Sequence, residues 1–148
     1  MSNLLIHSGE WVVVCDGAKA LVLENVGDAK FPNLKMREVY EQKDLATHEI
    51  GSDKPGRAFN SVTSGRGAVK QTDWHDQAEH AFLTDLAKRL DADVKSGKVK
   101  SLIVVAPPRA LAVLRPAYTH ALKSAVRAEV NKDLVKMPVD QIEKHLTA

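Results

Sequence analysis

The sequence predicts a single α/β domain, in which a mixed β-sheet of about five strands is covered by helices. Short apolar, β-branched runs fill the first third of the chain, as expected for strands. A helical repeat of apolar residues occupies the middle, and a continuous apolar run of strand length follows it. The expected element order is β-β-β-α-β-α-β-α, with three antiparallel strands first and parallel crossovers after them.

The first third of the chain predicts three strands. The segments 10–17 (EWVVVCDG) and 19–27 (KALVLENVG) are short apolar runs that end in Asp-Gly and in Gly. The residues 16–18 between them are typical of a hairpin turn. The segment 34–42 alternates imperfectly between apolar and charged residues and follows a Pro-Asn turn, which fits a third strand.

The clearest predicted helix spans residues 73–95. Apolar side chains recur every four residues along it, and their neighbours widen the stripe. Asp73 suits the N-cap, and Gly97 follows as a stop signal. Residues 43–72 show no sustained period of either kind, so we expect a long flexible loop there. A loop of that length inside a domain is usually functional or disordered.

The second half of the chain predicts a buried strand between helices. Residues 99–108 form a continuous apolar run, which is typical of a central strand buried on both faces. Residues 109–115 can make two helical turns, and Pro116 suits the first position of a new helix. Residues 126–134 predict a fifth strand, and Pro138 can open the last helix. Neither half has enough apolar residues to stand alone comfortably, so residues 1–148 are expected to form one domain.

Composition excludes several classes of protein. The chain has 148 residues, of which 44% are hydrophobic and 27% are charged, values that are ordinary for a soluble globular domain. Its one cysteine, Cys15, lies in an apolar run, which indicates a buried structural thiol. The N-terminus does not fit a secretory signal, and no apolar run approaches the ~20 residues that span a bilayer. A cytoplasmic location and no membrane partner are therefore expected.

Charge is distributed unevenly along the chain. Residues 88–136 hold 11 basic and 4 acidic side chains, a balance of +7, whereas residues 1–53 hold 5 basic and 9 acidic ones. Such asymmetry permits a face that binds a polyanion, although a set of solvated surface lysines is equally compatible with it.

Metal and nucleophile patterns are weak. The six histidines are accompanied by no cysteine pair, and His75 and His80 lie roughly 140° apart around a helix. No metal and no cofactor are therefore expected. There is no G-x-S-x-G motif, and no catalytic residue is assigned. The expected strand order resembles the ribonuclease H-like topology, whose nucleases bind metal through acids on the first strand and beyond. Asp16 and Glu38 fall near such places and leave a metal-dependent nuclease as an alternative, although two-metal chemistry needs several converging carboxylates.

The segment GSDKPGRAFNSVTSGRG (51–67) is the best candidate for a binding loop. Residues 54–70 contain four basic side chains and no acid, and their glycines allow close approach to a ligand. Arg side chains and free backbone N–H groups suit phosphate oxygens. A plain mobile loop is the alternative. The residues expected to contact a nucleic acid are Lys54, Gly56, Arg57, Asn60, Gly65, Arg66, Gly67, Lys70 and Gln71.

Several segments in this order resemble the bacterial host-attachment protein family, whose members are named as proteins required for attachment to host cells. They cover nearly the whole chain, and are WVVVCDGAKALVLEN, DKPGRAFNS, DWHDQAEHAFLTDLAKRL, SLIVVAPPRALAVLR and VRAEVNKDLVKMPVDQIEKHL. The family is similar in turn to the middle domain of archaeal and eukaryotic peptide-chain release factors and to related ribosome-rescue proteins. In that domain a loop carrying Gly-Gly-Gln precedes a long helix.

The resemblance implies an intracellular domain that associates with RNA or the ribosome. This sequence has Ser64-Gly65-Arg66-Gly67 at the corresponding place and no Gly-Gly-Gln anywhere. The resemblance therefore implies binding without peptide release, with the ribosome or RNA as partner. A host-cell attachment or adhesion factor is the alternative that the family name suggests.

Overall fold

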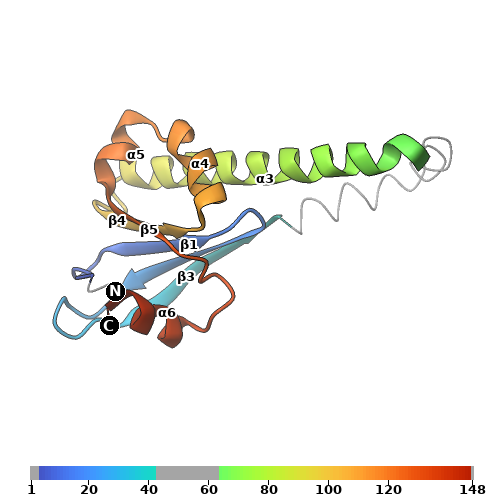
Figure 1. Ribbon diagram of the computed structural model, residues 1–148. Helices are drawn as coiled ribbons and strands as arrows, with labels where there is room; N and C mark the ends of the chain where they lie inside the picture. The colour runs from blue at the N-terminus through green and yellow to red at the C-terminus, as the bar shows by residue number, and fades with distance from the viewer. Residues whose placement is uncertain (1–3, 43–63, 148) are drawn as a thin grey trace.

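The computed structural model describes the backbone of residues 4–42 and 64–147, and the side chains of residues 4–42 and 76–147. Within these ranges a single mixed sheet contains β1 (Trp11–Cys15), β2 (Lys19–Asn25), β3 (Leu34–Glu41), β4 (Leu102–Ala106) and β5 (Val126–Asn131). The strand order is β3-β2-β1-β4-β5 (Figure 1). β1 and β3 pair antiparallel with β2, whereas β4 pairs parallel with both β1 and β5. The predicted α/β class and mixed sheet are confirmed, and the ribonuclease H-like likeness stays a prediction.

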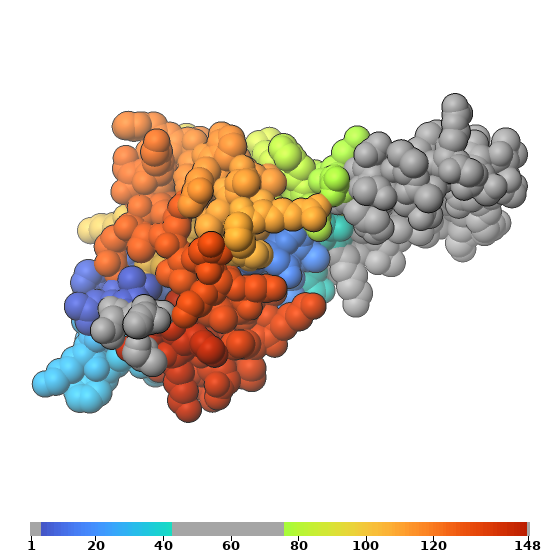
Figure 2. Space-filling model, in the orientation of Figure 1, coloured from blue at the N-terminus to red at the C-terminus, as the bar shows by residue number. Residues whose placement is uncertain are grey.

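Helices cover both faces of this sheet. They are α3 (Ser64–Lys95), α4 (Pro108–Ala117), α5 (His120–Ala125) and α6 (Val139–Thr147). α3, α4 and α5 lie on one face and α6 lies on the other (Figure 1). The space-filling view shows α4, in light orange, directly against the yellow-green part of α3 (Figure 2). No helix in the described ranges is both long enough and apolar enough to span a bilayer.

The core has two layers, one on each side of the sheet. Every residue of β1 and of β4 is buried, because helices cover both faces of these interior strands. The run at 99–108 was predicted to be a strand of this kind, and β4 confirms it. The β1–β2 hairpin is also confirmed, since the amide of Asp16 donates to the carbonyl of Lys19 at 2.9 Å.

The end of α3 agrees with the prediction. Gly97 has φ of +84°, the left-handed conformation that glycine adopts most easily. Its amide donates to the carbonyl of Val94 at 3.1 Å, and the amide of Lys98 donates to Asp93 at 3.0 Å. These two bonds form a Schellman motif that satisfies carbonyls in the last turn.

The start of α3 differs from the prediction. The helix begins at Ser64, so Asp73 lies inside it and is not its N-cap, and residues 64–72 are helical instead of part of a loop. The physical reason is visible in Figure 1, where this part of α3 projects beyond the sheet. A helical segment with no core to face needs no apolar stripe, and the stripe was the signal used to locate the helix. The rest of the predicted loop, residues 43–63, lies outside the described residues.

Two predicted element boundaries in the second half of the chain were also wrong. Pro116 lies inside α4 near its end, where it does not start a helix. α5 begins instead after Thr119, whose hydroxyl oxygen accepts from the amide of Leu122 at 3.1 Å and so caps the helix. β5 ends at Asn131, and the next three residues of the predicted strand, 132–134, leave the sheet.

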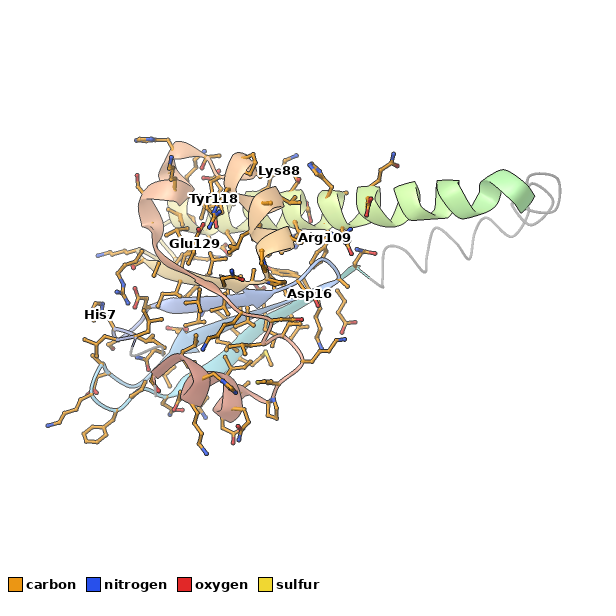
Figure 3. All side chains as sticks on the ribbon, in the orientation of Figure 1. His7, Asp16, Lys88, Arg109, Tyr118 and Glu129 are labelled. Carbon is orange, nitrogen blue, oxygen red and sulfur yellow. The ribbon has the colours of Figure 1, made fainter. Side chains whose placement is uncertain are left out.

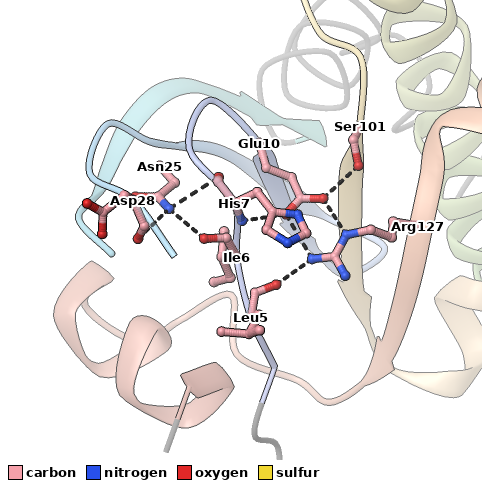
Figure 4. A network of polar contacts seen from close by, with 8 residues as sticks. All are labelled: Leu5, Ile6, His7, Glu10, Asn25, Asp28, Ser101 and Arg127. Atoms are coloured by element: carbon pink, nitrogen blue, oxygen red, sulfur yellow. Dashed lines mark hydrogen bonds and ion pairs between the residues drawn. The ribbon is translucent and has the colours of Figure 1, made fainter. Parts of the chain in front are cut away.

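A buried asparagine organises the turn between β2 and β3. The Asn25 side chain is fully buried. Its amide nitrogen donates to the carbonyls of Ile6, at 2.8 Å, and of Asp28, at 3.3 Å (Figure 4). Its oxygen accepts from the amides of Gly27 and Asn33 at 2.9 and 2.8 Å. One side chain therefore satisfies backbone groups from both the N-terminal segment and the turn.

Candidate functional site at the carboxyl ends of β1 and β4

The carboxyl ends of β1 and β4 mark a topological switch point. These two strands are parallel neighbours, but the chain leaves β1 toward β2 and leaves β4 toward β5, on the opposite side. In open α/β sheets, ligands bind preferentially in the crevice at such a point. The projecting part of α3 extends from this same end of the sheet (Figure 1). The topology of the sheet therefore favours this end as the place where a ligand would bind.

A cavity of about 260 Å³ lies at this end. The hairpin turn after β1, the middle of α3 and the start of α4 form its walls. Asp16 and Arg109 lie close together here in the side-chain view (Figure 3). The lining residues are Asp16, Gly17, Ala18, Glu79, Leu83, Pro107, Arg109, Ala110 and Val113.

Arg109 links the start of α4 to α3. Its Nη2 lies 2.5 Å from Oδ1 of Asp76 and 3.0 Å from Oε1 of Glu79. All three side chains are substantially exposed, so these ion pairs orient the two helices more than they stabilise them. Neither Arg109 nor Glu79 was predicted from the sequence to belong to a site. The position of Arg109, just after a buried strand, was a usable signal, because strand ends at a switch point face ligands.

Asp16 holds the hairpin turn. Its Oδ1 accepts from the amides of Ala18 and Lys19 at 2.8 and 2.9 Å, as in an Asx turn. Gly17 lies against α3, and a Cβ atom added there would be 2.7 Å from Cγ and Cδ of Glu79. The hairpin and α3 are therefore in close contact through a glycine.

The carboxylates that suggested a nuclease are not brought together. Glu38 accepts from the hydroxyl of Tyr40 at 2.6 Å and lines a different pocket from Asp16. Among the residues whose side chains are described, no three or more His, Cys, Asp or Glu side chains form a group that could hold a metal ion. The described part of the chain thus offers no observation in favour of two-metal chemistry.

The predicted binding residues divide into two sets. Gly65, Arg66, Gly67, Lys70 and Gln71 lie in the first two turns of α3, a helix whose first turn contains no acid. The other four, Lys54, Gly56, Arg57 and Asn60, lie outside the described residues. The structure therefore brings the first set onto one projecting helix, and their role as ligand contacts stays a prediction.

The end of β3 also lies at the hairpin turn. The backbone amide of Gln42 donates to the carbonyl of Ala18 at 2.8 Å, and its side-chain amide donates to the carbonyl of Gly17 at 2.7 Å. The chain therefore leaves the described part of the sheet beside the cavity at the switch point.

The positive charge of residues 88–136 is partly compensated by ion pairs, including pairs with acids outside this window. At least six of its 11 cations form them: Arg89, Lys95, Lys98, Arg109, Arg115 and Arg127. Several of the acids come from outside this window, namely Glu10, Asp76, Glu79 and Asp85. The sequence count of +7 therefore overstates the charge available to a polyanion.

Comparison with known proteins gives the family. Residues 11–146 match the family described as "Protein required for attachment to host cells", and the chain belongs to this family. An uncharacterized protein of Rickettsia prowazekii (strain Madrid E) is 34% identical over 94 residues, which cover 64% of this chain. The matched region spans 58% of the length of that relative.

Proposed function

We propose that this member of the host-attachment family is a cytoplasmic RNA-binding domain that associates with the ribosome or another RNA and has no membrane partner. Its contact surface is the projecting start of α3 together with the segment that precedes it. One observation carries the proposal: the acid-free basic run at 54–70 continues into a helix that extends away from the sheet. A projecting, positively charged helix end is suited to reach a phosphate backbone.

The dimensions support this role. At about 1.5 Å per residue, residues 64–75 alone lengthen α3 by about 18 Å. The cations Arg66 and Lys70 lie four positions apart, and so share one side of the helix. The N–H groups of the first turn have no acceptor within the helix itself, and the helix dipole adds a partial positive charge there. Both features favour a polyanion over a neutral partner.

The similarity to release-factor middle domains belongs to the same proposal. In those domains the catalytic loop lies just before a long helix, and the residues expected at the corresponding place here, Ser64–Gly67, form the first turn of α3. Gly-Gly-Gln is missing from this sequence. We therefore expect the domain to bind without hydrolysing peptidyl-tRNA.

A salt-dependence experiment tests the proposal. The full chain is sedimented with purified bacterial ribosomes, and its affinity for a labelled single-stranded RNA is measured by fluorescence anisotropy at several salt concentrations. Replacing both Arg66 and Lys70 by Ala should weaken binding and lower the slope of log K against log salt by about 1.4, or about 0.7 per phosphate contact. The matched control replaces Lys88 and Lys123, two exposed lysines on α3 and α5, and should leave both quantities unchanged. Equal effects of the two double variants, or no binding by the native chain, would contradict the proposal.

The family description names attachment to host cells, and we propose that any such role is indirect. Cell fractionation distinguishes an indirect, intracellular role from direct contact with the host cell. Protein recovered only with cytosol and ribosomes supports an indirect role, whereas protein accessible to protease on intact cells contradicts it.

A further inference from the structure

β3 is an edge strand of the sheet that the described residues form, and it carries two exposed apolar side chains on one face. Met36 and Val39 are 47% and 45% exposed. They lie opposite Leu23 and Leu21 of β2, which are buried in the layer that contains α6. α6 covers only the beginning of β3, where the amide of Leu34 donates to Oε1 of Glu143 at 3.0 Å. Among residues 4–42 and 76–147, no element thus covers Met36 and Val39, where the apolar layer reaches the edge of the sheet.

A bulge in β3 changes which face its side chains take. The β2–β3 register shifts between Val22 and Leu23, and Arg37 is the extra residue. Arg37 lies on the α3 face, with its guanidinium 4.7 Å from the ring centroid of Trp11. Glu38 lies opposite Val22, which also belongs to the α3 face. Two consecutive residues therefore share a face, so a regular strand cannot match the alternation on both sides of the bulge.

We propose that β3 pairs antiparallel with β3 of a second copy of this chain, about a two-fold axis at the peptide between Arg37 and Glu38. In this register Met36 of each copy faces Val39 of the other, and Arg37 faces Glu38. Apolar side chains thus oppose apolar ones, and opposite charges oppose each other. The outer pairs are Leu34 with Glu41 and Lys35 with Tyr40, so no like charges lie directly opposite.

The bulge selects this register and this partner. With the axis at Arg37–Glu38 the two bulges coincide, and every opposed pair lies on the same face of the joined sheet. If the two copies of β3 were shifted by one residue from this register, side chains that belong to different faces would lie opposite each other. A shift by two residues would produce the same mismatch at the bulge. Bulges and charges protect edge strands from general pairing. In β3 the bulge and the charges still permit one pairing, the isologous pairing with an identical strand.

Disulfide cross-linking tests the register directly. Residues directly opposite in antiparallel strands have Cα atoms about 4.5 to 5.5 Å apart, within the range of a disulfide. Met36→Cys and Val39→Cys chains are prepared separately, mixed and oxidised. A cross-linked dimer is expected in the mixture but in neither variant alone, because identical positions lie three residues apart along the strands, about 10 Å. Efficient cross-linking of either variant alone, or none in the mixture, overturns the proposed register.

Sedimentation equilibrium of the full chain tests the association. A single pair of strands buries little surface, so a concentration range of about 10 to 500 µM is needed. The native chain should form dimers, and Val39→Lys should raise the dissociation constant about tenfold, because both apolar pairs are lost. Val26→Lys is the matched control, since Val26 is 54% exposed but lies outside β3. A native chain that is monomeric throughout, or equal weakening by the two variants, overturns the proposal.

Discussion

The guanidinium of Arg127 donates to both carboxylate oxygens of Glu10, with Nε 2.6 Å from Oε2 and Nη2 2.9 Å from Oε1. The Glu10 side chain is only 1% exposed, and it also accepts from the hydroxyl of Ser101 and the amide of His7 (Figure 4). Arg127 in turn donates to the carbonyl of Leu5. This buried ion pair joins the N-terminal segment to the beginnings of β1, β4 and β5.

Replacing Arg127 should lower the stability of the fold more than is usual for a partly exposed arginine. Arg127→Ala leaves the buried carboxylate of Glu10 without its cation, and we expect a loss of about 2 to 3 kcal/mol in the free energy of unfolding. The measurement is urea denaturation at neutral pH. Lys98→Ala breaks a more exposed pair with Asp93 at 3.8 Å, and should change stability by no more than about 0.5 kcal/mol. Equal losses in the two variants would contradict a special role for the buried pair.

The Glu10 carboxylate should make stability depend on acid pH. Burial by itself raises its pKa, but hydrogen bonds from Arg127, Ser101 and the amide of His7 outweigh burial and lower the pKa from 4.5 to about 2. A carboxyl whose pKa is depressed by folding stabilises the protein above its unfolded pKa, and that contribution is lost as pH falls toward the folded value.

Glu10→Gln provides the measurement for this pH effect. The native chain should lose its advantage over the variant progressively between about pH 5 and pH 2, by about 2 to 3 kcal/mol in total. Denaturation curves at pH 7, 4 and 3 give the comparison. A difference between the two chains that stays constant over this range would exclude Glu10 as the source.

Two glycines should respond differently to alanine. In Gly27→Ala the new Cβ would lie 2.3 Å from the carbonyl oxygen of Phe31, and a backbone atom cannot move away cheaply. We expect a loss of about 2 to 3 kcal/mol. Gly97→Ala meets no atom within 4 Å and is disfavoured only by its φ of +84°, so it should cost about 1 kcal/mol. Thermal unfolding of both variants checks the ranking, and the reverse order would refute the steric argument.

The thiol of Cys15 should be unreactive in the folded protein. Burial, with a smaller contribution from the charge of Asp16, raises its pKa to about 12. A thiol with this pKa carries almost no thiolate near pH 8. We expect a thiol reagent such as DTNB to label Cys15 only after denaturation, whereas a Val39→Cys variant should be labelled in the folded state. Rapid labelling of the native chain would show that the strand opens locally.

Local patterns allowed most of the sheet to be predicted. The β1–β2 hairpin follows from Asp16 and Gly17, and the burial of β4 follows from an unbroken apolar run. The start of α3 could not be predicted in this way. Apolar periodicity records contact with the core, and α3 contacts the core through residues such as Leu83, Leu86 and Leu90, well after its first turn.

Neither the candidate site nor the ion pair at the opposite end of the sheet could be predicted from local patterns, because both depend on charges that pair over long distances in the chain. Arg109 binds Asp76, 33 positions away, and Arg127 binds Glu10, 117 positions away. A count of charges within a window treats these arginines as free. Their compensation depends on the fold that brings α4 against α3 and β5 near the beginning of β1.

α3 is held against the sheet along only part of its length, and its start projects beyond the sheet (Figure 1). The buried residues Leu83, Leu86 and Leu90 hold one part of it against the sheet, and Ser64 lies 19 positions before Leu83, or about 28 Å along the helix axis. A tilt of about 5° at the held part would displace the Ser64 end by about 2.5 Å, by the same helical rise. The packing around Leu83, together with the ion pairs of Asp76 and Glu79 with Arg109, therefore sets the direction of the projecting part of α3, and substitutions there can redirect it without altering a residue at the tip.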